Sequence, residues 1–223
     1  MKRTALTLGV FLFFVAACNN TAEPKTDGGE KKTEPKKEEA AKEATPPPMD
    51  EAAMMKAWND FKTPGEMHKW IASTDGVWTA NVTQWMDPAA PPTKSTATMV
   101  NKTVLGGLYQ TGSYKGTMMG MPFEGLSTLA YDNGKKMFVS TWIDNMGSGI
   151  VYLTGQYDAA TKTLNLKGKQ TDPMTGMDSD MREVIVFTDA NTQKMEMYGA
   201  GMDGKETKFM EMVSTRKKII GMF

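Results

Sequence analysis

The sequence predicts an all-β domain, folded as an antiparallel up-and-down β-barrel of about ten strands, and three observations lead to this fold class. Beyond Ser73, segments rich in Thr, Val, Tyr and Trp are interrupted about every ten residues by Gly, Asp and Asn, which is typical of antiparallel strands. No interval between two segments is long enough for a helix, so each strand pairs with its neighbour in the chain. An open sheet of such strands would have unprotected edges, and closure into a barrel removes them.

Each strand is predicted from its own run of β-branched and aromatic residues, and the turns between the runs supply the boundaries. The predicted strands span residues 76–86, 95–105, 107–117, 121–131, 135–143, 149–157, 162–170, 181–188, 193–200 and 205–216. Two connections, Asn133-Gly134 and Asp203-Gly204, fit two-residue type I′ hairpins, because each pair tolerates the positive φ angles of that turn. The first of them places Trp142 opposite Gly125, which has no side chain to obstruct the indole.

The final hairpin carries four methionines whose thioethers share one face of the sheet. With a two-residue turn, the facing pairs are Met195 with Met212 and Met197 with Met210. On the other face Glu196 lies opposite Glu211, and two like charges in this position are unfavourable. We therefore expect a cation such as Arg182 or Lys194 between the two carboxylates.

Two short helical segments are predicted before the first strand. Asp50 is a suitable N-cap for the first segment, and the second begins after Pro64. Both carry an apolar face at helical spacing, made of Met54, Trp58 and Phe61 in the first segment and of Met67, Trp70 and Ile71 in the second. The entering helix joins the first strand at the end of the barrel where the connections are short, and we expect it to close that end.

Residues 1–17 are predicted to be a lipoprotein signal peptide. Lys2 and Arg3 precede an apolar run that ends at Cys18 and is too short for a membrane-spanning helix. The stretch Val15-Ala16-Ala17-Cys18 resembles the lipobox of bacterial lipoproteins, in which the cysteine receives diacylglycerol after cleavage. The resemblance implies that the acylated Cys18 anchors the protein in a lipid bilayer of the bacterial cell envelope.

Residues 18–48 are predicted to be a disordered tether between this anchor and the folded domain. From Asn19 onward the segment consists mainly of Lys, Glu, Pro, Ala, Thr and Gly, and such a composition cannot bury a core. Asn19 is not the aspartate that retains enterobacterial lipoproteins in the inner membrane. By this analogy we expect the outer membrane, with the domain facing the periplasm.

Residues 49–223 remain as one domain, and its composition excludes several classes of function. The formal net charge is zero and the pI is about 6.6, so a nucleic-acid partner is not expected. Cys18 is the only cysteine, which leaves no thiol for a disulfide, a zinc cluster or a nucleophile. The single histidine, His68, falls on a predicted helix, where a packing or surface role is expected. We therefore expect no enzymatic activity and no cofactor.

Methionine, of which the chain has 21, occurs in every loop at one end of the predicted barrel and in none at the other. In a meander, alternate loops lie at the same end of the barrel. One end collects the short connections 105–107, 132–134, 158–161 and 189–192. Every connection at the other end carries methionine, and these residues are Met86, Met118, Met119, Met121, Met146, Met174, Met177 and Met202. Because methionine adapts to irregular apolar partners, this rim indicates an entrance for an apolar ligand. The alternative is that these methionines fill gaps between the loops.

The chain also resembles known families at specific motifs. Gly76-Val77-Trp78 resembles the Gly-x-Trp motif of the calycins, in which the tryptophan packs across the closed base of the barrel. A second set of motifs resembles the bacterial family of unknown function DUF1579. These motifs are Leu105-Gly106-Gly107, 120–125, 131–133, 142–147, 172–176, Arg182, Met210-Glu211 and 215–217. This likeness covers most of residues 66–217 and implies a calycin-type barrel with no assigned reaction.

Together these features favour a non-enzymatic binding protein that holds a small apolar or amphipathic molecule inside the barrel. The expected site residues are Trp78, Phe123, Tyr131 and Trp142 in the interior, Asp144 and Met146 at the mouth, and Arg182 with Glu211 at a polar end. One alternative is copper(I) binding by the methionines of the final hairpin, Met195, Met197, Met210 and Met212, because soft ligands select this ion. The other is a structural or partner-docking lipoprotein whose barrel is packed solid.

Overall fold

The computed structural model describes residues 50–86, 90–201 and 204–218. The predicted signal peptide, the predicted lipidation site at Cys18 and the predicted tether lie outside these residues. Within the described part of the chain, no helix has both the length and the apolar character needed to cross a membrane.

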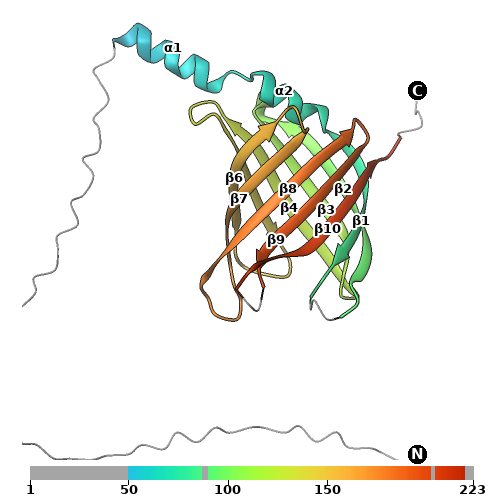
Figure 1. The fold of residues 1–223 in the computed structure, drawn as a ribbon. Coiled ribbons are helices and arrows are strands. Elements are labelled where there is room, and N and C mark those ends of the chain that lie inside the picture. Colours follow the sequence, from blue (N-terminus) through green and yellow to red (C-terminus); the bar gives the residue numbers. More distant parts are fainter. Residues whose placement is uncertain (1–49, 87–89, 202–203, 219–223) are drawn as a thin grey trace, which may run out of the picture. The chain divides into compact units, whose positions relative to one another are not determined.

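The fold is a closed antiparallel barrel of ten strands in which each strand pairs with its neighbours in the chain and β1 pairs with β10 (Figure 1). Two helices, α1 (Glu51–Lys62) and α2 (Glu66–Ser73), and a short 3-10 turn, η1 (Leu105–Gly107), complete the described elements. The strands are β1 (Gly76–Gln84), β2 (Thr93–Val104), β3 (Tyr109–Met118), β4 (Met121–Asp132), β5 (Met137–Asp144), β6 (Val151–Asp158), β7 (Thr163–Thr171), β8 (Asp178–Asp189), β9 (Thr192–Ala200) and β10 (Glu206–Arg216). The predicted fold class and all ten predicted strands are confirmed.

Helix α1 forms as the sequence predicts but buries none of its side chains. Asp50 caps it, since the carboxylate accepts a hydrogen bond of 2.7 Å from the backbone N–H of Ala53. The amide of Asn133, in the β4–β5 turn, donates to the carbonyls of Phe61 and Thr63 at 2.9 Å each. The apolar face of α1 is largely exposed, and Trp58 is among its exposed members.

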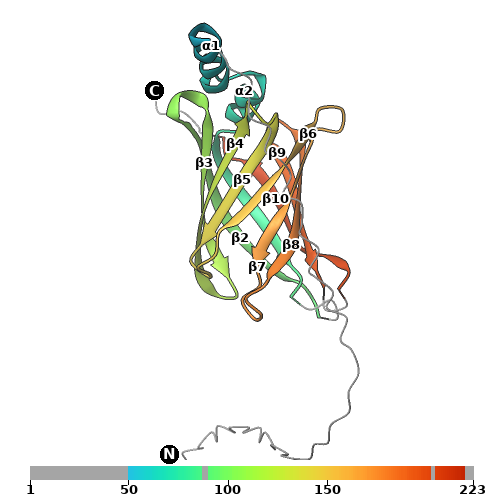
Figure 2. The same cartoon turned by 90° about the vertical axis from the view of Figure 1, so that its left-hand side faces the viewer.

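Helix α2 packs across one end of the barrel, as both views show (Figure 2). Its Ile71 is buried, and Trp70 meets aromatic rings from three strands. Their centroids lie 5.3 Å away for Phe138, 4.2 Å for Tyr157 and 4.9 Å for Phe187. Edge and tilted contacts of this kind add to the apolar burial that holds the helix in place.

Trp78 and Arg216 tie the start of β1 to the end of β10 at this closed end. The indole N–H donates to the carbonyl of Thr74 at 3.2 Å, and only 1% of Trp78 is exposed. The Arg216 guanidinium lies 4.3 Å from the centre of the indole ring and donates to the carbonyls of Ser73, at 2.8 Å, and Asp75. The expectation that the helical segment closes this end of the barrel is confirmed.

The register of the final hairpin is also as the sequence predicts. Met195 pairs with Met212 and Met197 with Met210, so all four methionines share the inward face. Glu196 pairs with Glu211 on the outward face. The turn is longer than two residues, because β9 ends at Ala200 and β10 begins at Glu206, and a bulge between Lys208 and Met210 restores the register.

The predicted register of the β4–β5 hairpin is wrong by two residues. Asp132 pairs with Met137, so the turn has four residues, and the Asp132 carboxylate accepts hydrogen bonds from the backbone N–H groups of Gly134 and Lys135. Trp142 therefore pairs with Ser127 and not with Gly125. The indole nevertheless lies over Gly125, where an added Cβ atom would overlap the ring.

Candidate functional site

The interior of the barrel holds a cavity of about 300 Å³ that is lined by inward-facing residues from all ten strands. At the closed end its lining includes Gln110 and Thr74, which hydrogen-bond one another beneath α2. At the other end it reaches Gln84 and Met118, the last residues of β1 and β3. The cavity therefore runs along most of the barrel axis and lies at the lower end of the size range of small-molecule pockets.

One side of the cavity is a methionine wall, formed by Met195, Met197, Met210 and Met212 from β9 and β10. Apolar residues of β7 and β8 continue it, among them Leu166 and Ile185. The amide of Gln84 lies 3.9 Å from the sulfur of Met210. Unbranched, polarizable side chains of this kind can repack around ligands of different shape.

The opposite side is aromatic and centres on Trp142. Its ring is edge-on to Tyr114, with centroids 4.8 Å apart, and parallel to Phe123 within 19° at 6.1 Å. Its indole N–H donates to the carboxylate of Asp144 at 2.7 Å. The absence of a side chain at Gly125 provides the space that the indole occupies.

Two ionisable side chains in the cavity lining, Glu183 and Tyr114, influence one another electrostatically. Glu183, on β8, lies between Leu166 of β7 and Met197 of β9 in the strand register. The side chain is half-buried and lines the cavity, and burial raises the pKa of Glu183 to about 7. Burial also raises the pKa of Tyr114, and the charge of Glu183 raises it further, against the hydrogen bond with Ser127.

The sequence-predicted site residues fall into three groups. Phe123, Trp142 and Asp144 line the cavity, as expected. Trp78 and Tyr131 lie in the packed closed end, where they are not part of the lining. Met146 lies in the loop after β5, is 41% exposed and does not line the cavity.

The third group, Arg182 and Glu211, lies on the outer face of the barrel, and this corrects their expected place at a polar end of the interior. Arg182 forms a bidentate ion pair with Glu206, at 2.7 and 2.8 Å, and stacks over the ring of Tyr198 at 3.8 Å. The reason is strand alternation: Glu183 faces inward, so its neighbour Arg182 must face outward. We therefore remove both residues from the candidate site.

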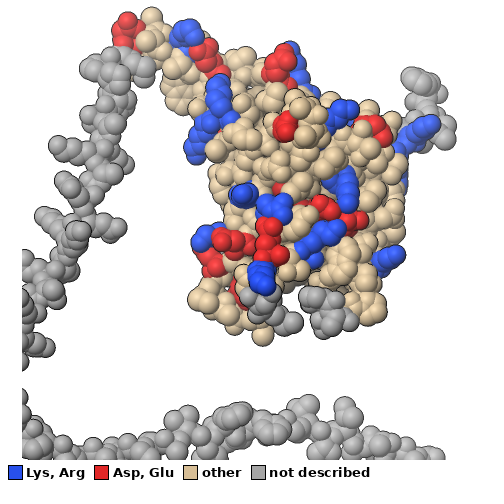
Figure 3. Space-filling view, viewed as in Figure 1, with Lys and Arg blue, Asp and Glu red and all other residues tan. Residues whose placement is uncertain are grey.

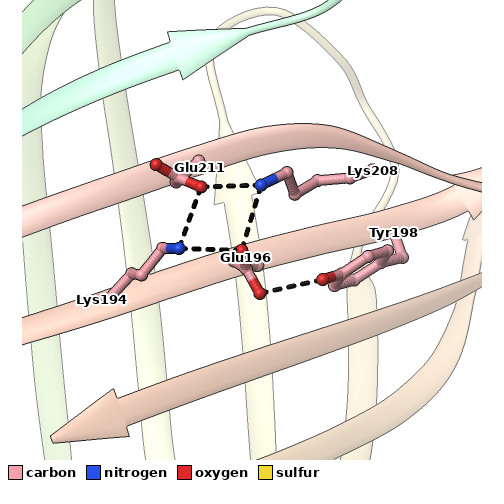
Figure 4. Close-up of polar contacts among 5 residues, drawn as sticks. All are labelled: Lys194, Glu196, Tyr198, Lys208 and Glu211. Carbon is pink, nitrogen blue, oxygen red and sulfur yellow. Dashed lines mark hydrogen bonds and ion pairs between the residues drawn. The ribbon is translucent and has the colours of Figure 1, made fainter.

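Glu211 belongs to an outer ion-pair ring on β9 and β10. The members of this ring are Lys194, Glu196, Lys208 and Glu211 (Figure 4). Each lysine lies within 3.1 Å of both carboxylates, and the Tyr198 hydroxyl donates to Glu196 at 2.8 Å. Burial alone would raise the pKa of Glu196, but the hydrogen bonds from Lys208, Tyr198 and Lys194 lower it to about 2. The expected cation between the glutamates is therefore Lys194, joined by Lys208, and not Arg182.

The methionines of the loops opposite α2 are mostly directed to solvent. Met118 lines the cavity, whereas the exposed members are Met86, Met119, Met121, Met146, Met174 and Met177. Met202 lies outside the described residues. Apart from Met118, the described rim residues do not form the wall of the interior site.

Sequence reasoning missed Glu183 and Tyr114. Both faces of β8 carry apolar residues, so alternation alone does not reveal which face is inward. The signal lay in the register: once the methionines of β9 face inward, Glu183 follows as the inward neighbour of Met197. Among the described residues, no group of three or more His, Cys, Asp or Glu side chains is arranged to hold a metal ion.

Comparison with known proteins gives a family and a fold. The family whose model matches residues 63–216 is described as "Protein of unknown function (DUF1579)". No curated protein matches the chain. The "Crystal Structure of Rv2717c from M. tuberculosis" is similar with a TM-score of 0.55 and 11% identity, over 70% of this chain and 100% of that one.

Weaker similarities extend to two other barrels. The "Structure of S-type Phycobiliprotein Lyase CPES from Guillardia theta" matches with a TM-score of 0.46 and 11% identity, over 72% of this chain and 98% of that one. The "Structure of a redesigned beta barrel, b11L5F_LGL" matches with a TM-score of 0.36 and 12% identity, over 66% and 95% of the two chains.

Proposed function

This chain belongs to the DUF1579 family of unknown function, and we propose that it is a binding protein that holds a small, largely apolar molecule inside its barrel. The observation that carries the proposal is the cavity of about 300 Å³ within a closed barrel. Most of the surface of its lining is apolar or aromatic, with polar side chains interspersed, which suits a small-molecule site. A structural lipoprotein with a solid interior would have no such space.

The chemistry of the interior supports binding over catalysis. The only histidine, His68, lies in α2, where its Nδ1 accepts a hydrogen bond from the backbone of Gly65 and its ring packs edge-on against Tyr131. Burial lowers the pKa of His68, which favours the neutral, packed form. No imidazole is therefore available to activate a hydroxyl nucleophile in the cavity, as a triad would require.

The proposal places this binding domain in the bacterial cell envelope as a lipoprotein. It rests on the sequence of the N-terminal segment, where Cys18 follows the apolar run and precedes the Lys/Glu/Pro-rich tether. Mass spectrometry of the protein expressed in a bacterial host should find a mature chain beginning at an acylated Cys18. A Cys18→Ala variant should leave the membrane fraction, and an unacylated, soluble wild-type protein would contradict the anchor.

Uptake of a neutral apolar dye, N-phenyl-1-naphthylamine, tests the binding function directly. A fluorescence rise that saturates at one dye per chain is expected. Ser95 lines the cavity, so Ser95→Phe should fill part of the space and abolish uptake. Its neighbour Thr96 is exposed on the outer face, so Thr96→Phe is the matched control and should leave uptake unchanged. Equal dye signals from both variants would place the dye outside the cavity.

A second candidate, copper(I) binding, is supported by the four inward methionines of β9 and β10. Thioethers are soft ligands that select this ion. Competition against a copper(I) chelator should detect binding if the methionine wall is a metal site. The double variant Met195→Leu, Met197→Leu keeps the volume of the wall, and an unchanged affinity in this variant would exclude the cluster as ligand.

A further inference from the structure

The cavity has a marked charge bias. Its described lining contains two carboxylates, Asp144 and Glu183, and no lysine, arginine or histidine. A ligand with an anionic head group would find no counter-ion inside the barrel and would lie near two groups of the same charge. Burying an unpaired charge is costly, so this interior disfavours fatty acids and other apolar anions.

The two carboxylates are not equivalent. Asp144 lies at the end of β5 and already accepts hydrogen bonds from the indole of Trp142, at 2.7 Å, and from the backbone N–H of Met146, at 2.8 Å. Glu183 makes no hydrogen bond or ion pair with any described residue. Because Glu183 lines the cavity and has no partner in the protein, its carboxylate oxygens are free to accept hydrogen bonds from a molecule in the cavity.

The surroundings of Glu183 favour a ligand as the missing partner. The strands on either side contribute Leu166 and Met197, which cannot donate a hydrogen bond to it. The ionisable groups that share the cavity with it are Tyr114 from β3 and Asp144 from β5. Neither supplies a positive charge, so the electrostatic complement must come from the molecule that enters.

We propose that the ligand is an amphipathic amine, whose apolar body lies against the methionine and aromatic walls and whose protonated nitrogen donates to the carboxylate of Glu183. The proposal rests on the function proposed above and names the class of molecule that fits the same cavity. No covalent step is involved.

The acid–base behaviour of Glu183 agrees with this assignment. Burial without a partner raises its pKa to about 7, so the carboxyl is only partly ionised near neutral pH. An ammonium group beside it would favour the ionised form and lower that pKa. Binding of the amine at pH 7 should therefore release protons, which titration calorimetry in buffers of different ionisation enthalpy can measure.

Displacement of the bound dye by three ligands of equal chain length tests the inference. Decylamine, decanol and decanoate differ only in the head group, and at pH 8 decylamine should bind about tenfold or more tightly than decanol. Decanoate should bind most weakly. At pH 5 Glu183 is protonated, and the advantage of the amine over the alcohol should largely disappear.

Two glutamate variants assign the effect to a single side chain. Glu183→Gln has the same shape and should remove the preference for decylamine while dye and decanol still bind. Glu211→Gln changes a carboxylate on the outer face and should keep the preference. Loss of the preference in Asp144→Asn together with its retention in Glu183→Gln would overturn the assignment to Glu183.

The remaining outcomes separate this inference from the function on which it rests. If the dye is taken up but decanol or decanoate binds as tightly as decylamine or more tightly, the amine is refuted and the binding function stands. If decanoate binding is lost in Glu183→Gln, a protonated Glu183 donates to an acid instead. A chain that takes up neither dye nor any of the three ligands refutes both proposals.

Discussion

Glutamate side chains on the inward and outward faces of the barrel wall have pKa values shifted in opposite directions. Glu183 and Glu196 lie on the adjacent strands β8 and β9, one facing the cavity and the other facing solvent. Burial without a partner raises the pKa of Glu183 to about 7. Lys208, Tyr198 and Lys194 outweigh the burial of Glu196 and hold its pKa at about 2.

The difference shows how the fold separates stability from binding. Outside, every carboxylate of the outer ion-pair ring is neutralised by lysines of the same hairpin, and acidic and basic side chains lie next to one another on the face drawn in Figure 3. Inside, a charge remains without a partner, which costs stability. A group retained at such a cost is a candidate for function.

The largest expected effect on the free energy of unfolding comes from a leucine-to-alanine substitution in the interior, compared with the same substitution on the outer face. Leu164 is fully buried in the core beneath α2, whereas Leu126 is 55% exposed on the outer face of β4. Leu164→Ala should lower the free energy of unfolding by about 2–5 kcal/mol. Leu126→Ala should change it by less than about 0.5 kcal/mol. Urea denaturation measures both, and similar losses would mean that the faces do not differ in packing.

The next effect reverses the usual direction, since removing the charge of Glu183 should stabilise the protein. The folded-state pKa of Glu183, about 7, lies above its ordinary value of 4.5, so its contribution falls as the pH rises from 4.5 to about 7. Glu183→Gln should raise the free energy of unfolding at pH 8 by about 2–3 kcal/mol and leave it nearly unchanged at pH 4.5. Stabilisation of the same size at both pH values would contradict a buried, unpaired carboxylate.

The smallest effect is expected in the outer ion-pair ring. The pKa of Glu196 is depressed from 4.5 to about 2, so its stabilising contribution is complete above pH 4.5 and is lost as the pH falls toward 2. Because the ring is partly solvated and screened, Glu196→Gln should cost only about 1 kcal/mol or less at pH 7. Salt should reduce this cost, and a salt-independent loss of several kcal/mol would show that the ring is structural.

The sequence by itself determined the barrel and much of its wall. Ten runs of β-branched and aromatic residues gave all ten strands, because local side-chain periodicity and turn residues act over short distances. It also determined that the four methionines of the final hairpin share one face and that Glu196 lies opposite Glu211, with Lys194 as one of two candidate cations between them. Both follow from pairing two strands across one turn.

Only the tertiary structure decided which residues meet across the cavity. The β4–β5 register depended on the carboxylate of Asp132, which accepts hydrogen bonds inside a longer turn than Asn133-Gly134 alone predicts. Glu183, and not the expected Arg182, faces the interior, because side chains alternate between the faces of a strand. Closure of the barrel then brings Glu183 and Tyr114, far apart in the sequence, into one low-dielectric space, and the local periodicity of the sequence does not encode that proximity.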